Sequence, residues 1–179
     1  VYFPVVTDDE IDVGSANTDL RHNFTLSGLY RLPFGDGPIL GGWSVNAILS
    51  AHTGYPLGMS MANNQSGTAF GNRPDRVCDG TLDDPTVRRW FDTSCFVAPA
   101  VGTLGNAART TLFGPGRWNA DLAITKNVAG FQLRAELFNV FNTAQFAAPN
   151  TVVGSPTFGQ ITSTVKSSRQ VQLAVKYLF

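Results

Sequence analysis

The chain has 179 residues, of which 43% are hydrophobic and only 15% charged, against a usual charged share of roughly 25% in soluble domains. Lys plus Arg and Asp plus Glu both number 13, so the net charge is zero and the basic footprint of a nucleic-acid-binding protein is absent. No apolar run approaches the roughly 18 residues of a membrane helix. This composition suits an all-β chain with long polar loops, and no nucleic-acid partner is expected.

The first two predicted strands alternate between apolar and polar residues, with the period of two that is typical of β-structure. Residues 20–32 form the first, whose apolar face holds Phe24, Leu26, Gly28, Tyr30 and Leu32. From Gly42 the alternation resumes, with Trp43, Val45, Ala47, Leu49 and Ala51 on one face. The Gly- and Pro-rich cluster at 33–38 predicts a short turn between them.

Three further strands are predicted at 118–126, 131–141 and 169–179. A tight turn at 127–130 joins the first two of these. The last strand places Val171, Leu173, Val175, Tyr177 and Phe179 on one face. Its length of about ten residues is what a tilted strand needs to cross a bilayer.

Two long segments, 56–116 and 145–168, separate these strands, and the longer one is predicted to be an extracellular loop. Such a length is unusual for a simple connection and indicates a functional or disordered segment, which we expect to be partly folded, with a helical turn beginning at Pro85. It contains Cys78 and Cys95, the only cysteines. A disulfide between them is favoured over two free thiols or a partial metal site, because no His lies nearby.

The lengths of the connections predict a topology. If strands alternate up and down, the short turns fall at one end and the long loops at the other, as in outer-membrane barrels. Aromatic residues concentrate near both ends of the strands, which is where membrane interfaces favour them. Five charged residues of the strands map to the polar face, which would line the lumen: they are Arg31, Asp121, Arg134, Glu136 and Lys176.

Several motifs resemble a known family. They are DLRH (19–22), WFDT (90–93), FGPGRWNADL (113–122), KN (126–127), RAELFNVFN (134–142), FGQI (158–161) and RQVQ (169–172). Together they resemble the C-terminal barrel portion of TonB-dependent receptors, in particular the Oar-like branch, which has an N-terminal carboxypeptidase-regulatory-like domain.

The resemblance implies a transporter of the bacterial outer membrane with a plugged barrel, for which 22 strands are typical. Five strands cannot close, so the chain is expected to be a C-terminal fragment (1–179) that lacks the plug and the N-terminal domain. The expected partners are outer-membrane lipid, the rest of the barrel with its plug, and the TonB complex through the missing part. The resemblance also implies an assembly signal at Tyr177 and Phe179, read by the outer-membrane assembly machinery.

Two other classes of function remain open at this point. A secreted β-sandwich or adhesin-like binding module would bury the same apolar face in a soluble core. An enzyme would need a nucleophile with a base or a pair of placed carboxylates. His22 and His52 are the only histidines, and neither belongs to a catalytic or metal-binding motif. We therefore expect no catalytic residue, no metal site and no cofactor.

Overall fold

The computed structural model describes residues 14–35, 37–67 and 72–177. The chain divides into two compact units. The sheet unit comprises residues 21–53, 116–145 and 164 onward, and the loop unit comprises the remaining segments at 54–115 and 146–163 with the chain before Arg21. Each long predicted loop therefore contributes to the same unit.

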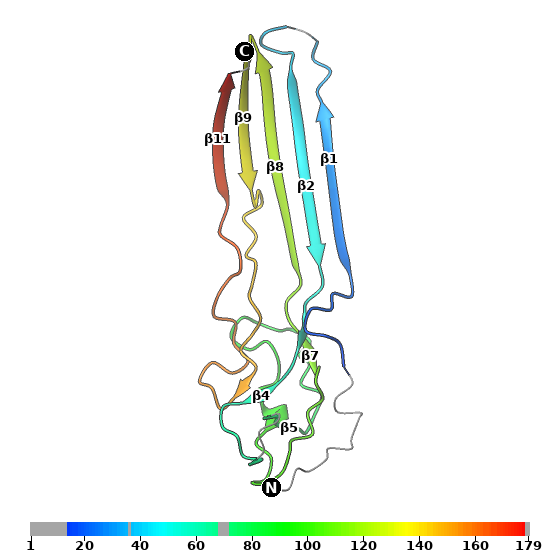
Figure 1. Ribbon diagram of the computed structural model, residues 1–179, viewed down its shortest axis with the longest axis vertical. Helices are drawn as coiled ribbons and strands as arrows, with labels where there is room; N and C mark the ends of the chain where they lie inside the picture. The colour runs from blue at the N-terminus through cyan, green and yellow to red at the C-terminus, as the bar shows by residue number, and fades with distance from the viewer. Residues whose placement is uncertain (1–13, 36, 68–71, 178–179) are drawn as a thin grey trace. The chain divides into compact units, whose positions relative to one another are not determined.

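The sheet unit consists of five long strands: β1 (Asn23–Arg31), β2 (Trp43–His52), β8 (Arg117–Val128), β9 (Phe131–Phe138) and β11 (Gln170–Tyr177). They form one antiparallel sheet in the order β1-β2-β8-β9-β11 (Figure 1). The prediction of an all-β fold with five antiparallel strands is confirmed. Among the described residues, no helix is long and apolar enough to cross a membrane.

The register of the sheet keeps the apolar residues of all five strands on one face. Leu26 pairs with Leu49, which pairs with Ala120 on the next strand. Leu137 pairs with Leu122 on one side and with Val171 on the other. Since residues directly opposite each other point to the same face, the alternation read along each strand becomes a continuous apolar surface across the sheet.

β1 begins at Asn23 rather than at 20, and the ends of β8 and β9 also differ from the sequence prediction. Backbone conformation explains the latter two. β8 continues to Val128 because the turn before β9 needs only Ala129 and Gly130, whose φ angles are 47° and 77°. Two successive positive φ angles define the type I′ turn that suits a two-residue hairpin. β9 ends at Phe138 rather than 141, because Asn139 has a φ of 52° and leaves the extended conformation.

The loop unit contains three pairs of two-residue strands. They are β3 (Pro56–Leu57) with β7 (Leu112–Phe113), β4 (Ser60–Met61) with β10 (Val152–Val153), and β5 (Asp75–Arg76) with β6 (Phe96–Val97). The β4–β10 pair is parallel and joins the two long predicted loops. A 3₁₀ turn, η1 (Thr93–Cys95), begins at Asp92, whose side chain accepts a hydrogen bond from the backbone N–H of Ser94.

The loop unit also has a hydrophobic core of its own, made of Leu57, Met59, Phe91, Cys95, Phe96 and Leu112. Phe158, from the second long loop, packs against it, with its ring centroid 5.2 Å from that of Phe91 in an edge-to-face arrangement. Backbone bonds add to this contact: the N–H of Trp90 donates to the Gly159 carbonyl at 2.8 Å. The unit is thus a folded body, where the sequence predicted only a partly folded loop.

The predicted helical turn at Pro85 is wrong. Thr86 and Arg89 face each other in an antiparallel bridge, with backbone N–H···O bonds of 2.9 and 3.1 Å in the two directions. The segment is a tight two-residue turn. Pro85 can begin a helix, but the residues after it here hydrogen-bond as a hairpin, which fixes the following Trp90 and Phe91 against the core.

Candidate functional site

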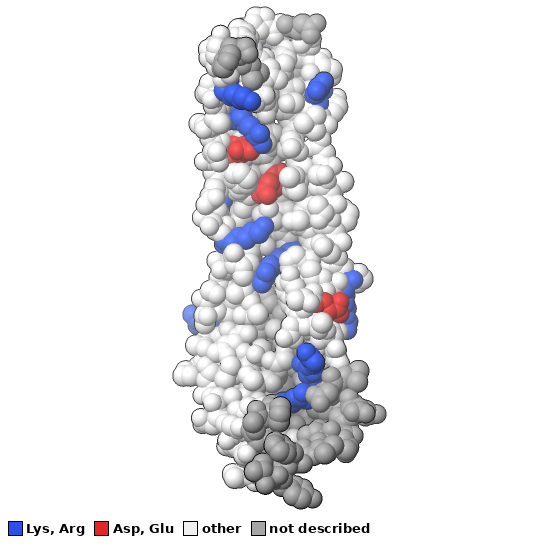
Figure 2. Space-filling model, in the orientation of Figure 1, with Lys and Arg blue, Asp and Glu red and all other residues white. Residues whose placement is uncertain are grey.

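The polar face of the sheet carries the charged side chains predicted to line the lumen, among them Asp121, Arg134, Glu136 and Lys176. The register confirms that they share one face, because Glu136 pairs with Gln172 and Arg134 with Ala174, each on the same side of the sheet as Lys176. Figure 2 shows basic and acidic side chains lying near one another over the sheet, within a largely uncharged surface. That this face is the lumen side of a barrel stays a prediction.

Arg134 and Glu136 form an ion pair along β9, with Nη2 and Oε1 2.6 Å apart. Their side chains are 46% and 19% exposed. An ion pair this accessible contributes at most about 1 kcal/mol to stability. The sequence analysis placed both charges on the polar face, and the structure adds that they neutralise each other.

Asp121 organises the end of the sheet near the long loops. Its Oδ1 accepts one hydrogen bond from Asn119 Nδ2 and one from the backbone N–H of Asn139, both at 2.8 Å. The Asn139 side chain in turn bonds both ways with the backbone of Thr143, at 2.9 and 3.0 Å. These bonds satisfy backbone groups that are left unpaired where β9 ends.

Two more amide side chains continue this network toward β11. The backbone N–H of Arg169 donates to Asn142 Oδ1 at 2.9 Å, immediately before β11 begins. Gln145 is buried, and its Nε2 donates to the Trp118 carbonyl. The backbone carbonyl of Gln145 accepts a hydrogen bond from the backbone N–H of Val165 at 2.8 Å. Sequence reasoning missed this network, although the recurrence of Asn after a strand was a usable signal for turns.

A hollow of about 350 Å³, which we call the polar pocket, lies on the polar face beside this network. Asn119, Asp121 and Phe138 line it, together with Asn139, segment 165–168 and Gln170. Asn119 is only 6% exposed. Its side-chain oxygen Oδ1 is buried and has no hydrogen-bond partner, and buried polar atoms of this kind call for an explanation.

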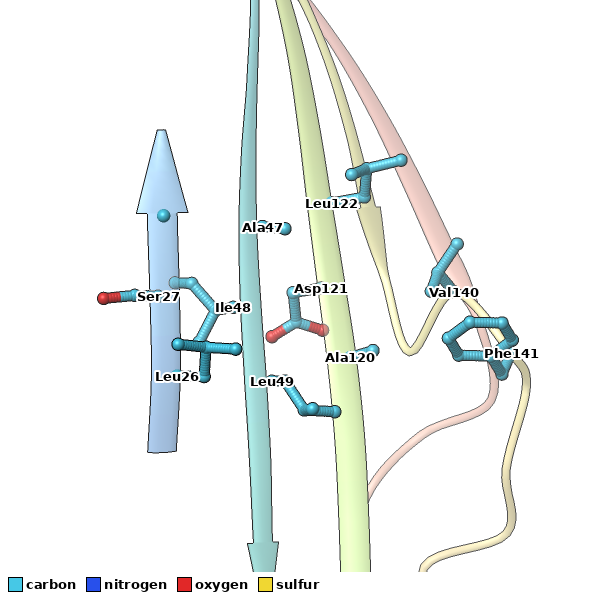
Figure 3. A pocket seen from close by; sticks show the side chains of 11 residues that line it. Leu26, Ser27, Ala47, Ile48, Leu49, Ala120, Asp121, Leu122, Val140 and Phe141 are labelled. Carbon is cyan, nitrogen blue, oxygen red and sulfur yellow. The ribbon is translucent and has the colours of Figure 1, made fainter. Parts of the chain in front are cut away.

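The opposite, apolar face has a depression of about 530 Å³ where small residues meet. The depression exists because three of its lining residues are small: Gly28, Ala47 and Ala120. Longer side chains surround it, among them Leu49, Leu122 and Phe141 (Figure 3). Ala47 pairs directly with Gly28, so two adjacent strands both lack bulk at this point. The face as a whole exposes many large side chains, among them Leu173, which is 77% exposed. Such a surface is unsuited to water.

Lys126 is a charge on the apolar face that the sequence analysis did not assign. It follows Leu122 and Ile124 with the same alternation, yet it is only 5% exposed. Its ammonium donates to the carbonyls of Ile39 and Gly41, and it lies 5.2 Å from the ring centroid of Trp43. The charge is therefore covered by the turn that joins β1 and β2, and by a cation–π contact.

Aromatic pairs lie near both ends of the sheet. Trp118 and Phe141 have ring centroids 5.6 Å apart near the long-loop end. Phe131 and Tyr177 are 5.0 Å apart beside the two-residue turn. Tyr177 ends β11 as described, whereas Phe179, the other half of the predicted assembly signal, lies outside the described residues. Both pairs lie where the sequence analysis placed aromatic residues, near the two ends of the strands.

The predicted disulfide is present in the loop unit, where it joins Cys78 and Cys95 with their Cα atoms 4.9 Å apart. Cys95 is 3% exposed and belongs to the hydrophobic core. Two aspartates stabilise neighbouring turns. Hydrogen bonds from Thr81 hold the pKa of Asp79 below its ordinary value, and hydrogen bonds from Ser94 and Arg89 do the same for the pKa of Asp92. Both groups are thereby held in the charged form.

The sheet unit thus combines a continuous apolar face, a polar face with charges, a tight turn at one end and long connections at the other. These features together define the wall of a transmembrane β-barrel, and the class is that of outer-membrane β-barrel proteins. A family described as "Outer membrane beta barrel domain" matches residues 2–172. The chain belongs to this family, and its location is the bacterial outer membrane. Comparison with curated proteins and with solved structures found no match.

Proposed function

We propose that the chain is part of the barrel of a TonB-dependent receptor, which takes up a substrate across the outer membrane with energy supplied from the inner membrane. The observation that carries this proposal is the polar face of the sheet. Charged groups such as Asp121 and Lys176 need water or polar partners. The lumen of a wide barrel with a plug supplies both along its whole wall.

The sequence motifs supply the finer assignment within the barrel family, since RAELFNVFN (134–142) and the segments that accompany it resemble this class of receptor. Five strands do not close a barrel, so further strands of the same protein are needed. On this proposal the described chain is a C-terminal fragment. The remaining barrel, a plug and the TonB-contacting segment would come from the rest of the protein.

The loop unit has a corresponding role in the proposal. A disulfide and an aromatic core give it a fixed shape without help from lipid. Binding residues often lie on loops held by a rigid scaffold. We assign to this unit the first contact with the substrate outside the cell, and to the polar face of the sheet the wall of the passage.

A conductance measurement tests the proposal without knowledge of the substrate. The complete protein is purified from outer membranes and inserted into planar bilayers. A plugged receptor is expected to show no steady current until urea unfolds the plug, after which it conducts as a wide pore. An unplugged diffusion pore conducts from the start, and this result would refute the proposal.

Uptake in cells provides the second test. A strain without the receptor is compared with its parent during growth on many single nutrients, in backgrounds with and without TonB. The expected result is a growth defect on a particular nutrient that appears only where TonB is present. A defect of equal size in both backgrounds would mean that transport by this barrel does not use TonB.

A further inference from the structure

We propose that the polar pocket binds a cationic hydrogen-bond donor, the guanidinium or primary ammonium group of a small solute. The inference rests on the proposed function, because it names a chemical class of ligand for the passage lined by the polar face. Three features of the pocket support it: an acceptor atom without a donor, a carboxylate without a cation, and an aromatic wall.

The acceptor without a donor is Asn119 Oδ1. The amide nitrogen of this residue already donates to Asp121, so the orientation of the amide leaves its oxygen turned to other partners. The side chain is almost fully buried. A buried acceptor that lacks a donor costs roughly 1 to 3 kcal/mol. Because this oxygen is buried, a ligand that supplies an N–H group reaches it by a small rotation of the Asn119 side chain toward the pocket, and the bond would then remove this cost.

The carboxylate without a cation is that of Asp121. Its two hydrogen-bond donors, the amide of Asn119 and the backbone N–H of Asn139, are both neutral. No cationic side chain of the described residues pairs with it. Arg134, the nearest cation along β9, lies opposite Thr125 in the register and pairs with Glu136. The negative charge is therefore left for a group from outside.

The pocket's size and its third wall fit a planar cation. Its volume of about 350 Å³ exceeds the space of one water, roughly 30 Å³, and falls in the usual range of small-molecule sites, about 300 to 1,000 Å³. Phe138 lines it and is 39% exposed. An aromatic face attracts guanidinium and ammonium groups by cation–π interaction.

An anion is disfavoured by the same geometry. The buried polar atom without a partner is an oxygen that can only accept, and a carboxylate lies beside it. Lys166 is the one positive side chain among the lining residues, and it belongs to the exposed connection before β11. We expect its ammonium to repel a cationic ligand. Removal of this charge should therefore raise the affinity for the ligand, whereas removal of the Asp121 charge should lower it.

The test is a titration of the complete protein, purified from outer membranes in detergent, with ethylguanidinium followed by saturation-transfer NMR. N-ethylurea serves as a neutral probe of similar shape, and acetate serves as an anionic probe. Ethylguanidinium is expected to bind in the millimolar range, since so small a ligand has a low ceiling of affinity. N-ethylurea and acetate are expected to bind at least tenfold more weakly.

Substitutions locate the binding. Asp121→Asn keeps an oxygen for the N–H of Asn139 but removes the charge, and it is expected to weaken ethylguanidinium binding roughly tenfold or more, the usual range for a charged hydrogen bond. Asn119→Leu should weaken binding as well. Lys166→Ala should strengthen binding. Thr125→Val, on the same face of β8 but outside the pocket, is the matched control and should leave it unchanged.

Equal binding of ethylguanidinium and N-ethylurea would overturn the inference, as would a signal that Asp121→Asn leaves at the level of Thr125→Val. No binding of ethylguanidinium would mean that water alone fills the pocket. If Asn119→Leu fails to fold, the comparison of Asp121→Asn with Thr125→Val still decides whether ethylguanidinium binds in the polar pocket. These measurements use neither TonB nor energy, so the binding site and the proposed transport function can fail independently.

Discussion

The backbone N–H of Asn139 donates to the side chain of Asp121 on the neighbouring strand, across 18 residues of sequence, at 2.8 Å. This bond ends β9 and supports the left-handed conformation of Asn139, whose φ is 52°. Side-chain bonds of Asn139 with the backbone of Thr143 close the turn that follows. One strand end therefore depends on a cross-strand carboxylate and on a residue that tolerates positive φ.

The first prediction concerns this conformation. Asn139→Gly and Asn139→Val both remove the side-chain bonds, but only valine is penalised at positive φ, by roughly 1 to 2 kcal/mol. Asn139→Val is thus expected to destabilise the barrel more than Asn139→Gly. Urea titration of the folded band on heat-modifiable gels measures the difference. Equal midpoints for the two variants would contradict the role of the backbone conformation.

The second prediction tests the assignment of the two faces. Leu122→Arg and Leu173→Arg would place a charge on the apolar face, which costs about 2 to 4 kcal/mol at the bilayer midplane. Gln172→Arg is the control, because Gln172 pairs with Glu136 on the polar face. The first two variants should lower the folded outer-membrane fraction and the third should not. Similar assembly of all three would show that the faces are wrongly assigned.

The third prediction concerns the disulfide of the loop unit. The two cysteines are 17 residues apart, and closing a loop of this size stabilises a fold by roughly 3 kcal/mol. Reduction of the wild-type protein is expected to speed amide hydrogen exchange in the loop unit while exchange in β8 and β9 stays unchanged. Uniform exchange before and after reduction would mean that the aromatic core alone holds the unit.

The fourth prediction concerns acid. Because the pKa of Asp92 is lower in the folded loop unit than its ordinary value of 3.8, this group adds stability above that value. The contribution is lost as the pH falls from about 3.8 through the folded pKa. Asp92→Asn should therefore flatten the loss of loop-unit stability between pH 5 and 2, measured by protease resistance. Asp84→Asn is the control and should keep the wild-type profile.

The alternation of apolar and polar residues was sufficient to predict the five long strands and their two faces. The reason is that a period of two has one structural interpretation when it continues for eight or more residues. In β8, the run Trp118, Ala120, Leu122 and Ile124 fixes the face of every residue in the strand. The same rule places Asp121 and Glu136 correctly without any knowledge of their neighbours.

The loop unit and the polar pocket could not be predicted in this way. Their contacts join residues far apart in the chain, such as Phe91 with Phe158, and two-residue strands have no readable period. Lys126 was missed for a related reason. The turn whose carbonyls cover it lies 85 and 87 residues earlier in the chain, so only the folded register shows that a charge is satisfied on the apolar face.

The last prediction concerns Phe179, which lies outside the described residues and which the sequence alternation predicts on the same face as Tyr177. Tyr177 pairs with Phe131 in the register, and their rings are 5.0 Å apart. β11 has no partner on its other side within the described sheet. An open edge is a template for strand addition, which is how we expect the assembly machinery to hold this strand, with Phe179 as the recognised residue.

Deletion of Phe179 in the complete protein is therefore expected to lower the folded outer-membrane population more than Phe131→Ala. The latter removes an aromatic from the same girdle but from a strand that has partners on both sides. Surface protease resistance and heat-modifiable migration measure the folded fraction of each variant. If Phe179 served only as an interface anchor, the two losses would be equal, so a larger loss for the deletion is what separates recognition during assembly from anchoring in the finished barrel.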